Sequence, residues 1–259
     1  MSALTFKQGI HPNYKKELTR DEPLKEARRP EEVIIPLQQH IGAPLKPLVE
    51  KGDHVDLGQK IGDTDSFVAA PVHASVSGTV KEIKEVQTAS GDKTLSIIIE
   101  ADAEDKLAEN VKAAGDLEDL SADEIRKIVR EAGIAGMGGA MFPTHVKLAV
   151  PEDKEVDYFV LNGAECEPYL TVDHRMMVER PEDVLFGMKV LMKAIDVEKG
   201  FIGIEENKPD AIEAMNEVVA DESGIEVKVF ETKYPQGGEK MMIKAALGRE
   251  VPVGGLPLD

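Results

Sequence analysis

The chain has 259 residues, of which 42% are hydrophobic, and it carries a net charge of −18 at pH 7. This length and composition are typical of a globular protein with one large domain or two ordinary ones. The negative charge argues against nucleic acid and anionic lipid as direct partners, because both attract basic patches.

Cysteine content and hydropathy limit the class of protein further. Cys166 is the sole cysteine, so neither an internal disulfide nor a cysteine-ligated cluster can be built from this chain alone. No window approaches the roughly 20 apolar residues of a membrane span, and the first residues lack the apolar core of a signal peptide. We therefore expect a soluble protein without a direct membrane span, cytoplasmic by default.

Residues 1–30 are polar and punctuated by proline, with a charged run in their second half. Two interpretations of this segment are open. It is either an extended N-terminal arm that lies on a later domain or a disordered leader.

Short β patterns separated by glycine and aspartate turns fill residues 31–101, which predicts a small closed β domain. The segments 51–55, 69–71 and 77–80 resemble the barrel-sandwich fold of biotinyl and lipoyl carrier domains. A carrier would need a lysine on the hairpin between its halves, and no lysine occurs from Gly62 to Val80. The resemblance therefore implies the shape of a carrier domain without its swinging-arm chemistry.

The acidic, alanine-rich residues 102–121 are predicted to form a linker that runs into a helix. Ser121 and Glu124 have the spacing of a capping box, in which each side chain accepts a hydrogen bond from the other residue's backbone amide. The predicted apolar face of this helix consists of Ile125, Ile128 and Val129.

A glycine-rich loop follows that helix. Gly136, Gly138 and Gly139 would let the backbone approach a ligand, and the proline four residues after them is typical of a helix start. Free amides at such a start attract phosphate, and Lys147 would add a positive charge about one turn later. The alternative is a flexible glycine hinge, since the spacing matches neither the dinucleotide fingerprint nor a Walker loop.

Beyond the loop, strand patterns alternate with helical ones, which predicts a parallel sheet with helical crossovers. The predicted strands cover residues 156–161, 200–204 and 225–230, and the predicted helices cover 181–192 and 210–219. Ligands of such sheets bind beyond the carboxyl ends of the strands. The turn 162–168 and the segment 234–240 are therefore expected on one edge. The predicted fold class is mixed α/β, with a barrel-sandwich domain followed by a Rossmann-like domain over residues 122–259.

The turn after the first of these strands contains two acids, Glu165 and Glu167. Such a pair could act as general acid and base, ligate a metal, or accept hydrogen bonds from sugar hydroxyls. A metal would need further ligands. The nearby Asp173, His174 and Arg175 are more typical of an ion-paired surface, so no metal site is predicted.

Two other side chains have alternative roles. Cys166 could be a nucleophile, but no histidine lies at an interpretable spacing, and a buried packing cysteine is favoured. His145, early in the loop helix, could contact a phosphate, but an exposed helix position is favoured.

Three segments in order, residues 136–144, 162–170 and 234–240, closely resemble the C subunit of the Rnf ion-translocating ferredoxin:NAD oxidoreductase. More distantly they resemble the flavin-bearing, NADH-binding subunit of respiratory complex I. The resemblance extends over nearly the whole chain, including residues 9–12 and the barrel-sandwich region. It implies FMN held on the glycine loop and NAD(H) stacked against it, with hydride transfer by the bound FMN and no catalytic side chain.

The resemblance also implies the residues of a cofactor pocket. Gly136, Gly138 and Gly139 border the flavin, and Lys147 lies close to the nucleotide. The remaining pocket residues come from the other two segments.

Of these, Asn162 and Glu165 match flavin-contacting positions. Glu167 matches an acid on the NADH side of the pocket. Gly238 and Glu239 fall in the third of these segments, residues 234–240, here called the third motif. By resemblance this motif lies around the same pocket.

The chain departs from its relatives at several points. The complex I relative has arginine in place of Met137 and aspartate in place of Ala164, so charge contacts at these two positions are not implied. The family continues into a further domain and a cysteine-rich segment with two four-iron four-sulfur clusters, whose ligands are absent from this chain. We therefore expect this chain alone to be a poor flavoprotein that cannot deliver electrons to ferredoxin.

By resemblance, the protein is a peripheral subunit on the cytoplasmic side of the cell membrane. Its partners are the other subunits of a complex that couples electron transfer between NAD(H) and ferredoxin to ion translocation. The alternative is a non-catalytic scaffold, or a cobalamin-reductase-like relative that keeps the fold to dock a partner.

Overall fold

The computed structural model describes residues 2–88, 91–137 and 141–259, and the chain divides into two compact units. The antiparallel unit comprises Ala27–Ala149. The parallel unit combines Met1–Glu26 with Val150–Asp259. None of the described helices is both long and apolar enough to cross a membrane.

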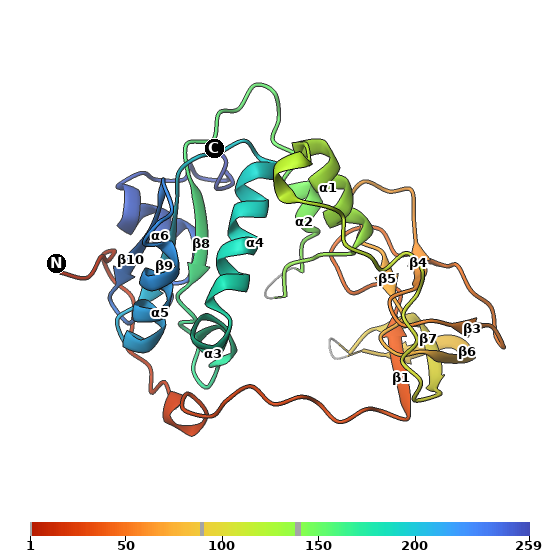
Figure 1. Ribbon diagram of the computed structural model, residues 1–259. Helices are drawn as coiled ribbons and strands as arrows, with labels where there is room; N and C mark the ends of the chain where they lie inside the picture. Colours follow the sequence, from red (N-terminus) through yellow and green to blue (C-terminus); the bar gives the residue numbers. More distant parts are fainter. Residues whose placement is uncertain (1, 89–90, 138–140) are drawn as a thin grey trace. The chain divides into compact units, whose positions relative to one another are not determined.

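Strands of 2 to 10 residues build the antiparallel unit (Figure 1). They are β1 Glu32–Pro36, β2 Lys46–Pro47, β3 His54–Val55, β4 Lys60–Asp63, β5 Val72–His73, β6 Gly78–Gln87 and β7 Lys93–Ala101. They form a four-stranded sheet of order β1-β7-β6-β3 and a three-stranded sheet of order β2-β4-β5. Apolar side chains of both sheets fill one core, in which Ile61, Ile97 and Ile99 are fully buried. This arrangement confirms the predicted barrel-sandwich class.

The same unit contains the short helix η2 Leu117–Asp119 and the helices α1 Ala122–Glu131 and α2 Thr144–Lys147. The predicted capping box starts α1: the Ser121 hydroxyl accepts from the Glu124 amide at 3.3 Å, and the Glu124 carboxylate accepts from the Ser121 amide at 2.9 Å. Ile125 is buried as predicted, whereas Ile128 is exposed. The buried stripe of α1 is therefore narrower than the sequence pattern predicts.

The described residues of 122–149, namely 122–137 and 141–149, group with the antiparallel unit. The sequence pattern instead predicts that the Rossmann-like domain begins at residue 122. The Arg130 guanidinium forms two hydrogen bonds with the Asp63 carboxylate, at 2.7 and 2.9 Å. The Nε2 atom of His145 lies 2.9 Å from the Phe67 carbonyl oxygen. His145 is buried, so the expected exposed position is wrong: its ring bonds to a strand connection that local sequence does not reveal.

The ion pair between Arg130 and Asp63 should make the antiparallel unit sensitive to acid. Burial raises the pKa of Asp63, but hydrogen bonds from Arg130 and Lys60 outweigh burial and lower this pKa from 3.8 to about 2. A carboxyl group with a depressed pKa stabilises the fold above its unfolded pKa and loses that contribution as the pH falls toward its folded pKa. We expect Asp63 to contribute about 2 kcal/mol at neutral pH, lost progressively between about pH 4 and pH 2.

Urea unfolding at about pH 6 and about pH 2.5 would measure this contribution in the wild type and in Asp63→Asn. The variant should be less stable near pH 6 and should show a smaller loss on acidification. An identical pH dependence in both proteins would contradict the assignment.

The parallel unit contains strands β8 Phe159–Gly163, β9 Gly200–Glu205 and β10 Ile225–Phe230, in the order β10-β9-β8. All neighbouring pairs are parallel, which confirms the predicted sheet. Its helices are η1 Lys16–Leu18, α3 Val172–Glu179, α4 Pro181–Ala194, α5 Pro209–Val219 and α6 Glu239–Leu247. Figure 1 shows α3, α4, α5 and α6 around the three strands.

Helices cover both faces of this sheet. Side chains of β9 alternate between the two faces, so they pack in two separate hydrophobic clusters. Ile202 and Ile204 pack with Met188 of α4 and Met215 of α5. Phe201 packs on the opposite face, in a cluster to which α6 and the N-terminal residues also contribute. The two covered faces are those of a Rossmann-like layer arrangement.

The N-terminal residues lie along the parallel unit as an extended arm. The Leu4 amide donates to the Val229 carbonyl at 2.9 Å, and the Ile10 amide donates to the Tyr234 carbonyl at 2.9 Å. Lys16, farther along, is buried. These bonds support the arm rather than the disordered leader.

Candidate functional site

The carboxyl ends of the three parallel strands bring their turns together. The Asn162 side-chain amide donates to the Gly237 carbonyl at 2.7 Å, and the Gly237 amide donates to the Cys166 sulfur at 3.3 Å. The Lys208 ammonium, after β9, donates to the Ala164 carbonyl at 2.6 Å. The turn 162–168 and the segment 234–240 therefore share one edge, as the sheet topology predicts.

Residues 164–170, here called the acidic turn, hold their two glutamates in different environments. Glu165 is buried with a left-handed φ of 48°, and its Oε1 accepts from the Asp173 amide at 2.7 Å. Its Oε2 lies 3.6 Å from the Lys16 ammonium. Glu167 is exposed. Glu165 is thus a largely structural carboxylate, while Glu167 is available to a ligand.

Beneath the turn lies a buried ion pair that sequence patterns do not indicate. The Lys208 ammonium is 3.3 Å from the Glu205 carboxylate, and both side chains are almost fully buried. Burial lowers the pKa of Lys208 and raises that of Glu205, while their mutual attraction opposes both shifts. Applying the strand-end rule to β9, as well as to its two neighbours, would have identified both residues.

Cys166 is a packing residue in this arrangement. Its side chain is buried, and burial raises the pKa of its thiol. A thiol with a raised pKa carries little thiolate, which disfavours the nucleophile.

The segment 173–175 is ion-paired, as expected, but it is not all surface. His174 is buried, and its Nε2 lies 2.7 Å from the Asp210 carboxylate. Arg175 pairs with Glu179 at 2.8 Å on the same helix. In the described part of the chain, no three His, Cys, Asp or Glu side chains are grouped as a metal would require.

Several buried polar atoms near the N-terminal arm and the third motif have no hydrogen-bond partner among the described residues. They include both side-chain amide atoms of Gln236, the Tyr14 hydroxyl and Oε2 of Glu165. Gln236 is fully buried. Buried polar groups are normally hydrogen-bonded, so these atoms are suited to water or to a polar ligand.

The third motif places its glycine and acid at the start of α6. Gly238 is the residue before the first turn, and Glu239 is the exposed first residue of the helix. Their backbone amides therefore lie at a helix N-terminus on the shared edge.

Two predicted site residues of the glycine loop, Gly138 and Gly139, lie outside the described residues. The described residues before and after them belong to the antiparallel unit. The Gly136 amide donates to the Phe142 carbonyl at 3.0 Å. A Cβ atom built on Gly136 would be 3.9 Å from the Lys147 ammonium. The backbone of Gly136 is thus open to a ligand and lies near a positive charge. Because α2 has only four residues, its helix dipole is smaller than the sequence pattern suggests.

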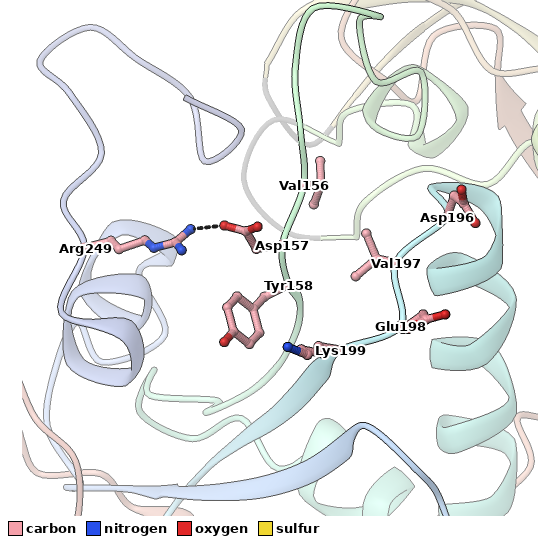
Figure 2. Close-up of a pocket in the computed structure, with 8 residues that line it drawn as sticks. All are labelled: Val156, Asp157, Tyr158, Asp196, Val197, Glu198, Lys199 and Arg249. Carbon is pink, nitrogen blue, oxygen red and sulfur yellow. Dashed lines mark hydrogen bonds and ion pairs between the residues drawn. The ribbon is translucent and has the colours of Figure 1, made fainter.

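An open pocket of about 430 Å³ lies at the opposite, amino-terminal edge of the parallel sheet (Figure 2). It is lined by Val156, Asp157, Tyr158, Asp196, Val197, Glu198, Lys199 and Arg249. The dashed line in Figure 2 marks the ion pair between Arg249 and Asp157, at 2.5 Å. Parallel sheets bind ligands at the other edge, so we place the candidate site at the acidic turn.

Two family models match most of this chain. One, described as the Nuo51 FMN-binding domain, matches residues 129–259. The other, described as the RnfC barrel sandwich hybrid domain, matches residues 4–104.

Curated relatives are similar over almost the whole chain. The C subunit of the Na⁺-translocating ferredoxin:NAD⁺ oxidoreductase complex from Acetobacterium woodii is 56% identical over 98% of this chain and 58% of its own length. The C subunit of the proton-translocating ferredoxin:NAD⁺ oxidoreductase complex from Clostridium ljungdahlii is 49% identical over 98% of this chain and 56% of its own length. The chain thus spans a little over half the length of these relatives.

Among solved structures, an NAD⁺-reducing NiFe-hydrogenase in the air-oxidized state matches 50% of this chain and 24% of its own chain. The identity is 26% and the TM-score is 0.43.

Proposed function

This chain belongs to the family of Nuo51 FMN-binding domains, and from that premise we propose that it binds FMN and NAD(H) in a subunit of an electron-transport complex. The observation that carries the proposal is the shared edge of the parallel sheet. There the turn that carries the exposed Glu167 is hydrogen-bonded through Cys166 to Gly237, next to the start of α6. The buried Gln236 side chain beside it has no hydrogen-bond partner among the described residues. The complex-level role, electron transfer between NAD(H) and ferredoxin coupled to ion translocation, is proposed from the names of the relatives.

The residues present fit such a cofactor. Around Gly136, open backbone beside the Lys147 ammonium suits a phosphate group. On the parallel unit, Asn162 and Glu239 offer polar groups at the strand ends, and Glu165 keeps an oxygen without a hydrogen-bond donor in the described chain. We propose these residues, together with Gly138, Gly139 and Gly238, as the cofactor-binding set.

When bound, FMN would supply the conversion between two-electron hydride transfer and single-electron transfer. The side chains of this chain bind and orient rather than react. Glu167 would accept hydrogen bonds from the ribose hydroxyls of NAD(H), and Lys147 would balance phosphate charge. We also propose that the partners are other subunits of the complex, and that the protein is peripheral to the cytoplasmic side of the membrane.

Anaerobic titration of the protein with FMN and then NADH tests this function. We expect FMN to bind at high added concentration, as for a poor flavoprotein, and the flavin absorbance to bleach after NADH is added. FMN without protein is the control. Bound flavin that NADH does not bleach would instead favour the non-catalytic scaffold or cobalamin-reductase-like alternative.

Glu167 should set the preference for NADH over NADPH. A carboxylate beside the ribose accepts its hydroxyl hydrogen bond and repels a 2′-phosphate. In Glu167→Gln the repulsion is removed, so the ratio of NADH to NADPH affinity should fall about tenfold, or ~1.4 kcal/mol. Isothermal titration with both dinucleotides measures the ratio.

The matched control is Glu213→Gln, which makes the same change at an exposed position of α5. It should keep the wild-type ratio. Equal ratios in wild type and Glu167→Gln would move the ribose site away from this acid.

A further inference from the structure

Lys16 belongs to the N-terminal arm, yet its ammonium is buried beneath the acidic turn. Its side chain is 7% exposed. The ammonium donates to three backbone carbonyls of one turn: those of Glu165 at 2.8 Å, Glu167 at 3.2 Å and Leu170 at 2.6 Å. These acceptors all belong to the segment that carries the two site glutamates.

A lysine ammonium has three hydrogen-bond donors and no acceptor. Carbonyls of the acidic turn therefore occupy all three N–H donors of Lys16. The Glu165 carboxylate, 3.6 Å away, balances its charge. Arm residues on either side add two further bonds. The Tyr169 amide donates to the Tyr14 carbonyl at 2.7 Å, and the Thr19 and Thr171 hydroxyl oxygens are 2.8 Å apart.

The acidic turn needs such support. Glu165 and Tyr169 both have left-handed φ values, 48° and 69°, without being glycine. Each such residue is strained unless its surroundings hold it. Three carbonyl oxygens directed at one point also repel one another unless a cation lies between them. The Lys16 ammonium supplies that cation from a distant part of the chain.

We propose that Lys16 is a positioning residue of the dinucleotide site: it fixes the backbone of the acidic turn and so places the exposed Glu167 carboxylate. The part that concerns Glu167 rests on the proposed function. Lys16 does not touch the ligand in this scheme. An arginine would not substitute, because its planar fork cannot direct three donors at a compact ring of carbonyls.

Lys16→Met tests the proposal, since methionine keeps an unbranched stem and removes the ammonium. The matched control is Lys7→Met, on an exposed residue of the same arm. Amide hydrogen exchange of the folded proteins, resolved by peptide, reports the turn directly. We expect exchange over residues 164–170 to be about tenfold faster or more in Lys16→Met, with β9 and β10 unchanged, because only the turn loses bonds. Lys7→Met should exchange as wild type does.

The second measurement is the ratio of NADH to NADPH affinity, which general destabilisation would leave unchanged. Lys16→Met should lower this ratio, Lys16→Arg should not restore it, and adding Glu167→Gln to Lys16→Met should lower it no further. If amide hydrogen exchange over residues 164–170 is the same in Lys16→Met as in the wild type, the proposal is overturned. An unchanged ratio with a loosened turn overturns the role through Glu167. If the wild type binds neither dinucleotide, the proposed function fails, while the exchange result still decides whether Lys16 holds the turn.

Discussion

Replacing Lys208 with methionine should lower the free energy of unfolding by about 3–5 kcal/mol, because it leaves a buried carboxylate without its partner. Lys208 and Glu205 are almost fully buried and 3.3 Å apart. The ammonium also donates to the Ala164 carbonyl at 2.6 Å and to the Asn207 side chain at 2.9 Å. All of these acceptors would lose a donor at once.

Urea unfolding of the wild type and Lys208→Met gives this difference. Lys199→Met, at an exposed position before β9, is the matched control and should change stability by no more than about 0.5 kcal/mol. The double variant Glu205→Leu with Lys208→Met should recover part of the loss, since apolar replacements of both partners are often neutral. A loss below about 1 kcal/mol in Lys208→Met would show that the pair is hydrated rather than buried.

Replacing Gly136 with valine should weaken FMN binding roughly tenfold to a hundredfold, on the basis of the cost of overfilling a packed site. A Cβ atom at Gly136 would make only ordinary contacts in the free chain, 3.8 Å from Phe142 and 3.9 Å from Lys147. The added methyl groups would instead occupy the space that a ligand on the loop requires. The effect should therefore appear in affinity and not in folding.

Flavin fluorescence titration measures the affinity, and thermal unfolding checks the fold. Gly187→Val is the control, because a Cβ atom at this position of α4 meets nothing within 4 Å. It should bind FMN as wild type does. Unchanged affinity in Gly136→Val would place the flavin elsewhere than on the glycine loop.

Local pattern in the sequence was sufficient for the elements and for the edge that carries the candidate site. Periodicity identified the strands around Ile97 and Ile202, and the Ser121 and Glu124 spacing identified the start of α1. Alternation of strands and helices determined that the sheet is parallel, which in turn placed Asn162 and Gly237 on one edge. Each inference rests on residues close together in the chain, where geometry follows from residue type and spacing.

The tertiary structure alone decided how charges and polar groups are distributed between core and surface. Lys16 and Glu165 are 149 positions apart, and no local pattern indicates that the arm carries a buried ammonium to the acidic turn. His145 and His174 are buried for the same reason, because their partners, Phe67 and Asp210, come from other segments. A polar side chain is buried only when a distant partner compensates its loss of water, and that partner is set by the packing of the whole unit.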